Sequence, residues 1–240
     1  MKRVVIVGAT SGIGMEIAKD YLKEGCLIGV AGRREELLAS LKTISPEKVF
    51  TERINVVDEE AQAALLLLIE KLGGMDLFIL TSGIGSSNYN LKPEIELETA
   101  RTNTEGFMRM TTAAFNYFSE NGGGHIAVIS SIAGTKGLGI APAYSATKRF
   151  QSHYIDALSQ LSRMRKLRIR FTDIRPGFVD TALLKKDKYP MLMKPEVVAR
   201  KIVKAVNRGR RRMVVDVRYR MLVFVWKLVP LWLWERLPIK

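Results

Sequence analysis

The 240-residue sequence is poor in the residues that build disulfide frameworks and metal clusters. Its only cysteine is Cys26, which excludes an intrachain disulfide and any multi-cysteine metal site, so we expect no bound metal. A lone cysteine is typical of a reducing compartment and favours the cytoplasm. The opening run Val4–Val7 is too short for the apolar part of a signal peptide and is better interpreted as a strand.

The sequence also lacks an apolar run long enough to cross a bilayer. Its most apolar segment, residues 221–234, has 14 residues and is interrupted by Lys227 and Pro230. A membrane-spanning helix needs roughly 20 predominantly apolar residues. The segment is therefore too short to span a membrane.

Acidic residues are scarce, since 24 Asp and Glu face 38 Lys and Arg, which leaves a formal net charge of +14. Residues 208–240 hold nine of the basic residues against only Asp216 and Glu235, so this segment alone carries +7. Such a charge is compatible with nucleic acid, an anionic membrane or a phosphate-bearing cofactor. No nucleic-acid-reading module is recognisable, so we expect no nucleic-acid partner.

Short apolar runs alternate with longer helix-forming stretches, a pattern typical of a parallel sheet covered by helices. We therefore predict an α/β protein with a single-domain, Rossmann-type, doubly wound parallel sheet and helices on both faces. Residues 1–207 would form the dinucleotide-binding and catalytic part, and residues 208–240 a basic, apolar C-terminal extension of the same domain. The predicted strands are Val4–Val7, Leu27–Ala31, Val49–Ile54, Leu77–Leu80, His125–Ser130 and Ile169–Ile174, and clear helical stretches are Gly14–Glu24, Glu59–Leu72 and Tyr144–Arg165.

A glycine-rich turn follows the first predicted strand and opens a predicted helix. Small residues let backbone amides approach a pyrophosphate, and the helix N-terminus favours an anion. An ordinary tight turn would look similar, but the strand before it and the helix after it fit a dinucleotide site. The residues predicted to bind the cofactor here are Gly8, Thr10, Ser11, Gly12, Ile13 and Gly14.

The end of the second predicted strand bears on which dinucleotide binds. An NAD site usually has an Asp or Glu there to accept hydrogen bonds from the adenosine ribose. This sequence has Arg33 and Arg34 instead, and guanidinium groups suit the extra 2′-phosphate of NADP. We therefore predict NADP(H), with NAD(H) less favoured, although the two arginines would also suit the solvated start of a helix.

Tyr144 and Lys148 are four residues apart in a predicted helix, so their side chains share one face. A tyrosine has a pKa near 10, and a neighbouring cation together with an oxidised nicotinamide would bring it closer to the working pH. Ser131 directly follows the strand before this helix and can donate a hydrogen bond to a substrate carbonyl. Each signal is weak alone, but their order along the chain predicts a hydride-transfer site.

These motifs resemble the short-chain dehydrogenase/reductase family over roughly residues 1–181. The resemblance implies that Ser131, Tyr144 and Lys148 form a catalytic triad and that Asn103 is its fourth member. In the family, the asparagine helps hold a water that links the lysine to solvent, and the lysine also binds the nicotinamide ribose. Members are usually dimers or tetramers, so a homo-oligomer is expected.

The resemblance also extends the expected cofactor site beyond the glycine-rich turn. Asn55 stands where a residue near the adenine is usual, and Gly83 allows close approach to the cofactor. The loop from Pro176 to Thr181 resembles the one that flanks the nicotinamide. The further cofactor residues implied are Asn55, Val56, Gly83, Tyr144, Lys148, Pro176, Gly177, Val179 and Thr181.

One residue and one four-residue segment depart from the family pattern. Val7 replaces a threonine common before the first glycine, and residues 80–83, Leu-Thr-Ser-Gly, replace the usual Asn-Asn-Ala-Gly. The second change removes amide side chains that brace the central strand, which leaves the local packing open. Neither change removes a group from the predicted reaction.

Residues 182–195 are predicted to cover the substrate as a lid. They are apolar with basic interruptions at Lys185, Lys186 and Lys188, which suits a hydrophobic or acyl substrate with an anionic end. An amphipathic surface helix would explain the same residues equally well.

The apolar segment 221–234 needs a burial partner. Its three tryptophans lie near several arginines, which would fit an anchor at the surface of an anionic membrane. Packing against the domain or a second subunit is the alternative.

The predicted function is NADP(H)-dependent hydride transfer between nicotinamide and the carbon of a carbonyl or secondary alcohol, with a small-molecule substrate that is hydrophobic or lipid-derived. A non-enzymatic NADPH-binding sensor or membrane-associated scaffold is the alternative, against which the intact set Asn103, Ser131, Tyr144 and Lys148 argues.

Overall fold

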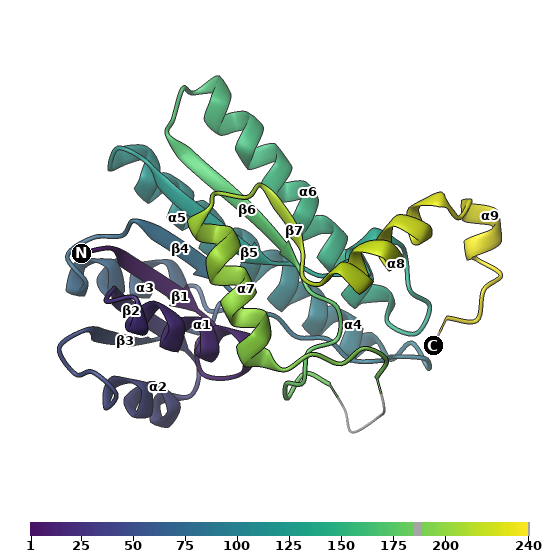
Figure 1. Ribbon diagram of the computed structural model, residues 1–240, viewed down its shortest axis with the longest axis horizontal. Coiled ribbons are helices and arrows are strands. Elements are labelled where there is room, and N and C mark those ends of the chain that lie inside the picture. Colours follow the sequence, from purple (N-terminus) through teal and green to yellow (C-terminus); the bar gives the residue numbers. More distant parts are fainter. Residues whose placement is uncertain (185–188, 240) are drawn as a thin grey trace.

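The computed structural model describes residues 1–184 and 189–239. Its centre is a parallel sheet in the order β3-β2-β1-β4-β5-β6-β7 (Figure 1). The sheet confirms the predicted doubly wound α/β class and the six predicted strands. The strands are β1 (Arg3–Val7), β2 (Leu27–Gly32), β3 (Val49–Arg53), β4 (Leu77–Leu80), β5 (Gly124–Ile129), β6 (Ile169–Arg175) and β7 (Arg212–Val214).

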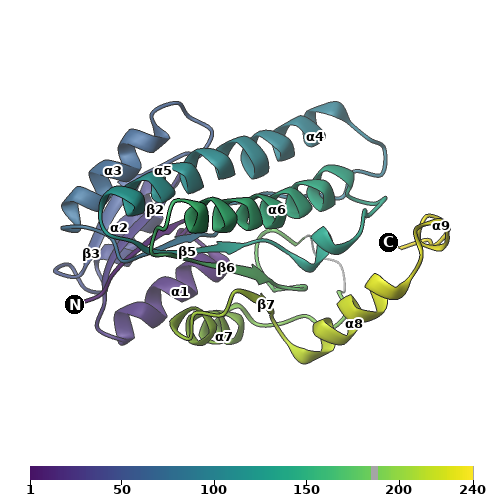
Figure 2. The same cartoon turned by 90° about the horizontal axis from the view of Figure 1, so that it is seen from above.

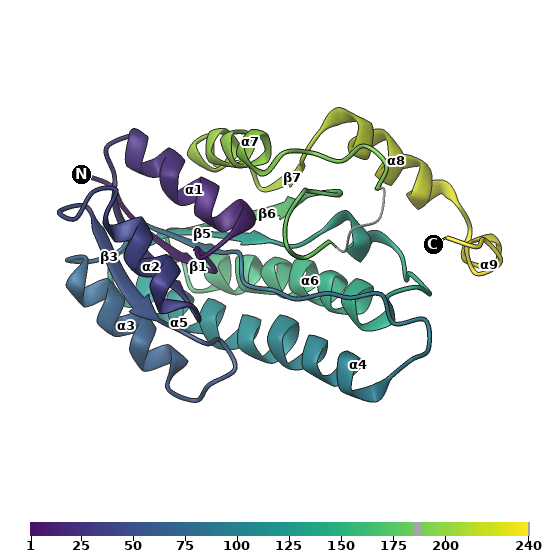
Figure 3. The same ribbon diagram turned by 90° about the horizontal axis from the view of Figure 1, so that it is seen from below.

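Helices cover both faces of the sheet, as predicted (Figures 2 and 3). Side chains alternate along β1, so that Val4 and Ile6 face one layer and Val5 and Val7 face the other. The first layer contains α1 (Gly12–Lys23), α2 (Glu35–Lys42), α7 (Pro195–Asn207) and α8 (Val217–Leu228), and the second contains α3 (Ala61–Lys71), α5 (Phe107–Glu120) and α6 (Pro142–Met164).

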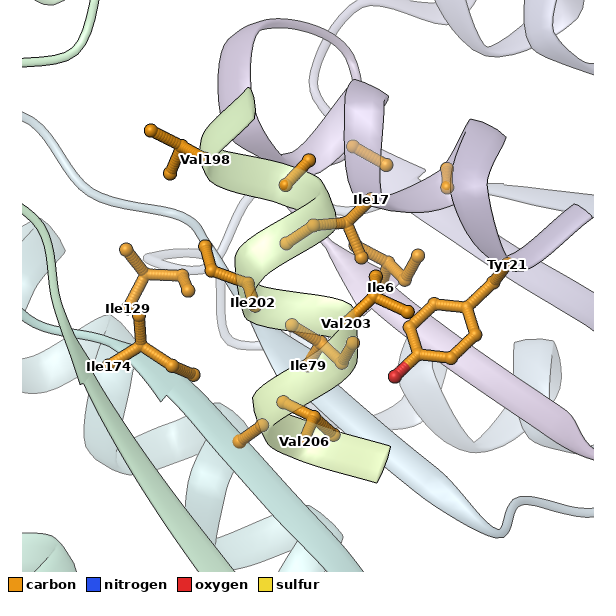
Figure 4. Close-up of a cluster of buried hydrophobic side chains, with 14 of the residues drawn as sticks. Ile6, Ile17, Tyr21, Ile79, Ile129, Ile174, Val198, Ile202, Val203 and Val206 are labelled. Carbon is orange, nitrogen blue, oxygen red and sulfur yellow. The ribbon is translucent and has the colours of Figure 1, made fainter. Parts of the chain in front are cut away.

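The first layer is held together by the packing of α7 against α1 and the sheet. Figure 4 shows Ile202 and Val203 of α7 beside Ile17 of α1 and Ile6 of β1, all buried. Burying one large aliphatic side chain stabilises the folded state by roughly 1.5–3 kcal/mol. The core thus fixes α1, and with it the glycine-rich turn, relative to the strands.

The sheet order reverses between β1 and β4, and ligands of such sheets bind beyond the carboxyl ends of the strands at this point. The turn after β1, the loop after β4 and the loop after β5 all lead away from this edge. The second layer continues there with α4 (Pro93–Ala100) and a π-helical turn, η1 (Arg101–Gly106), which precedes α5. Candidate site residues from distant parts of the sequence are therefore brought to one edge.

The C-terminal segment contributes a strand to the sheet, because β7 pairs with β6 at the edge. With three residues it is too short to produce a periodic signal, so it could not be predicted from the sequence. After α8, Pro230 starts a short helix, α9 (Leu231–Trp234). Among the described residues, no helix is long and apolar enough to cross a membrane.

Candidate active site

The glycine-rich turn connects β1 to α1 in a conformation that depends on glycine. Gly8 and Gly12 have φ angles of +97° and +54°, which side chains disfavour. A Cβ on Gly14 would lie 2.3 Å from the carbonyl oxygen of Gly8. Ser11 precedes α1 without capping it, and the first turn holds no acidic residue. The helix N-terminus therefore presents its amides with no competing carboxylate of its own, which fits a phosphate group.

Thr81 resolves the question that the altered sequence after β4 raised. Its hydroxyl oxygen lies 2.9 Å from the carbonyl oxygen of Gly8 and 3.1 Å from that of Val7. A single hydroxyl thus ties the loop after β4 to the end of β1. The Thr81 hydroxyl thus braces the central strand, a role that amide side chains have in the family pattern. Leu80, at the other altered position, is buried in the core.

Arg34 connects the end of β2 to the glycine-rich turn. Its guanidinium donates hydrogen bonds to the hydroxyls of Thr10, at 2.9 Å, and Ser11, at 2.8 Å. Arg33 beside it is exposed. Two cations therefore stand where an acidic residue would stand in a site selective for an unphosphorylated ribose.

Asn55 and Val56 follow β3 near the same edge. The Asn55 amide donates a hydrogen bond to Asp58 at 2.7 Å, and the carbonyl of Val56 accepts one from Arg109 at 2.9 Å. Val56 is buried and Asn55 is half-buried. Their contact with an adenine remains a prediction.

Tyr144 and Lys148 share one face of α6, as predicted from their spacing. The ammonium nitrogen of Lys148 lies 5.8 Å from the centre of the Tyr144 ring. Two glycines of the loop after β4 make room for these side chains. A Cβ on Gly85 would lie 2.3 Å from the Tyr144 ring, and one on Gly83 would lie 3.3 Å from Lys148 Nζ.

Asn103 is fully buried in the π-helical turn η1 and faces the same loop. Its side-chain oxygen accepts from the Ile84 amide at 2.9 Å, and its side-chain nitrogen donates to the Ile84 carbonyl at 2.7 Å. The nitrogen also lies 3.2 Å from the Thr147 hydroxyl, next to Lys148 in sequence. The structure therefore brings the predicted fourth member beside the lysine.

Gln151 is a further site residue, which was not predicted from the sequence. Its side-chain oxygen accepts from Lys148 Nζ at 3.0 Å, and its nitrogen donates to the Asn103 carbonyl at 2.9 Å. Its position three residues after Lys148 places it on the same helix face, and that spacing was the available signal. The lysine also donates to the Ile129 carbonyl, at 3.0 Å.

Ser131 follows β5 and begins a short 3-10 turn, η2 (Ile132–Thr135). Its hydroxyl accepts from the Ala133 amide at 3.1 Å. Next to it, Ser130 donates to the buried Asp173, which also binds Arg175 at 2.8 Å. The end of β5 is therefore anchored to β6, and Ser131 is held at the predicted strand end.

Burial controls the protonation of the tyrosine and the lysine. It lowers the pKa of Lys148 to about 8, against a smaller opposing effect of Asp173. It raises the pKa of Tyr144, while Ser131 acts in the opposite direction. The lowered pKa expected for Tyr144 depends on the charge of an oxidised nicotinamide as well as on Lys148, so it stays a prediction for the protein with its cofactor bound. For the protein's own groups, burial raises this pKa.

The loop from Pro176 to Thr181 lies against the glycine-rich turn on one side and α8 on the other. A Cβ on Gly12 would meet the Thr181 side chain at 2.9 Å, so the two are in close contact. Gly177 packs on the ring of Tyr219, and Val179 forms a β-bridge with Met193.

Tyr219 of α8 was not predicted as a site residue, yet its hydroxyl contacts both the loop at Phe178 and the segment at Pro190 and Met191. Its hydroxyl accepts from the Phe178 amide at 3.1 Å and lies 2.9 Å from the Pro190 carbonyl and 3.1 Å from that of Met191. Of the predicted lid 182–195, residues 185–188, which include Lys185, Lys186 and Lys188, lie outside the described residues. The lid thus stays a prediction.

Comparisons with known proteins identify the family to which this fold belongs. A family model described as short chain dehydrogenase matches residues 2–190. A Dehydrogenase/reductase SDR family member 7B from Xenopus tropicalis is 29% identical over 237 residues, covering 88% of this chain and 76% of the relative. A putative ketoacyl reductase from Streptomyces coelicolor is 31% identical over 188 residues, covering 75% of this chain and 71% of the relative.

A solved structure has the same fold. The 3-ketoacyl-(acyl-carrier-protein) reductase from Brucella melitensis, complexed with NADH, superposes with a TM-score of 0.79 at 24% identity, covering 90% of this chain and 96% of that one. Because the family model matches residues 2–190, the chain belongs to the short-chain dehydrogenase/reductase family. It is an NAD(P)-dependent oxidoreductase of that type, acting on CH-OH or C=O groups.

Proposed function

We propose that this protein is an NADP(H)-dependent oxidoreductase that interconverts a carbonyl and a secondary alcohol on a hydrophobic, lipid-derived small molecule. When bound, the nicotinamide supplies or accepts the hydride. The observation that carries the proposal is the packing of Tyr144 and Lys148 around Gly83 and Gly85, at the edge where the glycine-rich turn lies.

The residues present fit a dinucleotide. Side chains on Gly8, Gly12 or Gly14 would collide with neighbouring residues, and the N-terminus of α1 is uncapped by any side chain. This combination leaves backbone amides available to phosphate oxygens. Gly8, Thr10, Ser11, Gly12, Ile13 and Gly14 would hold the pyrophosphate, Asn55 and Val56 would lie by the adenine, and Gly83, Tyr144, Lys148, Pro176, Gly177, Val179 and Thr181 would surround the nicotinamide and its ribose.

In the reductive direction, the Tyr144 hydroxyl donates a proton to the carbonyl oxygen as the hydride reaches the carbon. Burial keeps this phenol protonated, which suits a proton donor. In the oxidative direction the same oxygen takes the proton back. Ser131 would donate a hydrogen bond to the substrate oxygen, where negative charge builds up.

Lys148 and Asn103 support the tyrosine in this proposal. With a pKa of about 8, the ammonium of Lys148 is mostly charged at neutral pH and stabilises negative charge on the phenolate oxygen. Gln151 and the Ile129 carbonyl hold the ammonium in place. Asn103 positions the loop that carries Gly83 through its two bonds to Ile84.

Arg33 and Arg34 support NADP(H) over NAD(H). Arg34 already reaches the turn residues Thr10 and Ser11, and a guanidinium can bind a phosphate through two parallel hydrogen bonds. A 2′-phosphate beside β2 would meet positive charge on both arginines.

The substrate class is supported by the apolar loop residues near the site and by relatives. Leu183 and Leu192 are exposed on the described parts of the predicted lid. The relative from Streptomyces coelicolor is called a putative ketoacyl reductase, which suggests an acyl-chain ketone.

The test measures oxidation of NADPH and NADH by the purified protein with a panel of ketones and aldehydes that includes long-chain and acyl-thioester members. We expect turnover that prefers NADPH and long apolar chains. Tight NADPH binding without turnover across a widened panel would instead favour the sensor or scaffold function, and equal rates with both cofactors would contradict the role of the arginines.

A further inference from the structure

The C-terminal helices carry an exposed apolar surface that the proposed oxidoreductase site does not use. It consists of Val217, Met221, Phe224, Val225 and Leu228 of α8, Leu231, Trp232 and Leu233 of α9, and Leu237 after it, and we call it the C-terminal apolar face. Phe224 is 64% exposed, Leu228 66% and Trp232 60%. Exposed apolar residues gathered in one place mark an interaction site.

Helix α8 is apolar on two opposite sides. Its inner side, with Tyr219 and Val223 buried, packs against the core. Its outer side carries Met221, Phe224 and Leu228 at intervals of three and four residues, the spacing of one continuous helix face. Packing against the domain therefore explains only half of the apolar residues in this segment.

The outer side of α8 is bordered by cations. At about 100° of rotation per residue, Arg218 flanks it on one side, and Arg220 and Lys227 flank it on the other. All three side chains are exposed, and Arg218 also pairs with Asp216 at 2.9 Å. An apolar face with cations on both flanks is the arrangement of a helix that lies in the surface of an anionic bilayer.

The face is held in place on the body of the protein. Trp234 is buried, and its indole nitrogen donates to the Gly137 carbonyl at 2.7 Å, while Lys136 donates to the Val229 carbonyl at 2.9 Å. Trp226 packs edge-on against Trp234. The exposed residues therefore do not need to fold upon binding, which lowers the entropic cost of docking. Figures 1, 2 and 3 all show α9 projecting at one end of the molecule.

We propose that the C-terminal apolar face docks this protein on the surface of an anionic lipid bilayer, with Phe224 and Trp232 inserted at the headgroup level. Charge complementarity favours a membrane over a second copy. Pairing two identical faces would bring Arg220 and Lys227 of each copy close to cations of the other, in a chain of net charge +14. Anionic headgroups would neutralise these cations.

Docking in this way orients the catalytic edge of the sheet. Helix α8 contacts η2, which follows Ser131, and its Tyr219 holds the loop that begins at Phe178. The bilayer would therefore lie beside the loops that surround the substrate. This inference does not depend on the proposed function, since binding to vesicles is measured without turnover.

The experiment is cosedimentation of the full chain with vesicles of phosphatidylcholine alone and with vesicles that also contain phosphatidylglycerol. We expect binding to the anionic vesicles that weakens with salt. The double variant Phe224→Ser/Trp232→Ser should bind about tenfold or more weakly, because it removes two inserted side chains. Ile44→Ser/Leu66→Ser changes two exposed apolar residues elsewhere and should bind like the wild type.

A second variant separates the charge from the apolar contact. Arg220→Glu/Lys227→Glu should lose affinity for anionic vesicles while any weak binding to phosphatidylcholine stays unchanged. Thermal unfolding of each variant checks that it folds. The proposal is overturned if the wild type binds neither vesicle, or if the Phe224/Trp232 variant binds as well as the wild type. A dimer in sedimentation velocity that this variant abolishes would also overturn it, in favour of a second copy.

Discussion

The ammonium nitrogen of Lys148 lies 5.8 Å from the ring centre of Tyr144 and donates to the Ile129 carbonyl and the Gln151 side chain, both at 3.0 Å. The lysine is thus held by neutral acceptors and stays close to the tyrosine. Neutral acceptors do not offset the cost of burying the ammonium, which is why its pKa falls to about 8.

Replacing Tyr144 with Phe should remove the proton donor while leaving the site's shape intact. We expect kcat to fall by roughly 10²–10⁴-fold, the usual contribution of general acid–base catalysis. NADPH affinity, measured by fluorescence titration, should change little. Substantial residual turnover in Tyr144→Phe would contradict the assignment of this residue as acid/base.

The lowered pKa of Lys148 predicts how stability depends on pH. The unfolded lysine titrates near 10.5 and the folded one at about 8, so between these values the unfolded state binds more protons. Stability from this residue therefore rises as pH increases through that window. Relative to Lys148→Met, the wild type should gain about 2 kcal/mol in free energy of unfolding between about pH 7.5 and pH 10. Denaturant titrations at several pH values measure the difference, and a difference independent of pH would show that the folded lysine has an ordinary pKa.

Arg34→Glu should change the cofactor preference. A carboxylate near Thr10 and Ser11 would repel the 2′-phosphate, so the KM for NADPH should rise by about tenfold or more while that for NADH changes little. Lys42→Glu makes the same charge change at the last turn of α2, away from the glycine-rich turn, and serves as the control. Equal effects of the two variants would assign the change to overall charge.

Thr81→Val removes the hydroxyl that joins the loop after β4 to β1. The Gly8 and Val7 carbonyls would lose a partner, so we expect a loss of about 1–3 kcal/mol in stability and weaker NADPH binding. Thr81→Ser keeps the hydroxyl and should restore most of both. Calorimetry measures the stability and titration measures the affinity for NADPH. If Thr81→Ser lost as much of both as Thr81→Val, packing of the methyl group would explain the effect instead.

Tyr219→Phe removes the hydroxyl that holds Phe178, Pro190 and Met191. We expect a loss of about 1–3 kcal/mol in stability and a higher KM for the cofactor. Tyr117→Phe is the matched control, because the Tyr117 hydroxyl accepts a hydrogen bond from the Met75 amide at 3.2 Å, at a distance from the cofactor loops. The Tyr117→Phe variant should lose stability without a change in the KM for the cofactor. A rise in KM in both variants would mean that KM responds to any loss of stability and not to the contacts of Tyr219.

The sequence predicts the fold well where its signals are local. Six strands are recognisable because most of them are short apolar runs bounded by turns. The glycine-rich turn and the Tyr144–Lys148 pair depend only on short spacings. β7 escapes prediction because three residues show no period. Thr81, Gln151 and Tyr219 gain their roles from partners that folding brings close. The rise that burial causes in the pKa of Tyr144 could not be predicted, because the depth of burial is a property of the packed structure.

The π-helical turn η1 places the side chain of Asn103 against the backbone of the loop after β4. The carboxamide of Asn103 meets the Ile84 peptide with one donor and one acceptor, the same pair that a neighbouring strand would present. The side chain thus acts as a one-residue strand that continues the pairing of β4 beyond the sheet. An Asp at position 103 would lack the donor, and a Leu would lack both groups. Position 103 should therefore tolerate few residues even in a protein selected for folding alone.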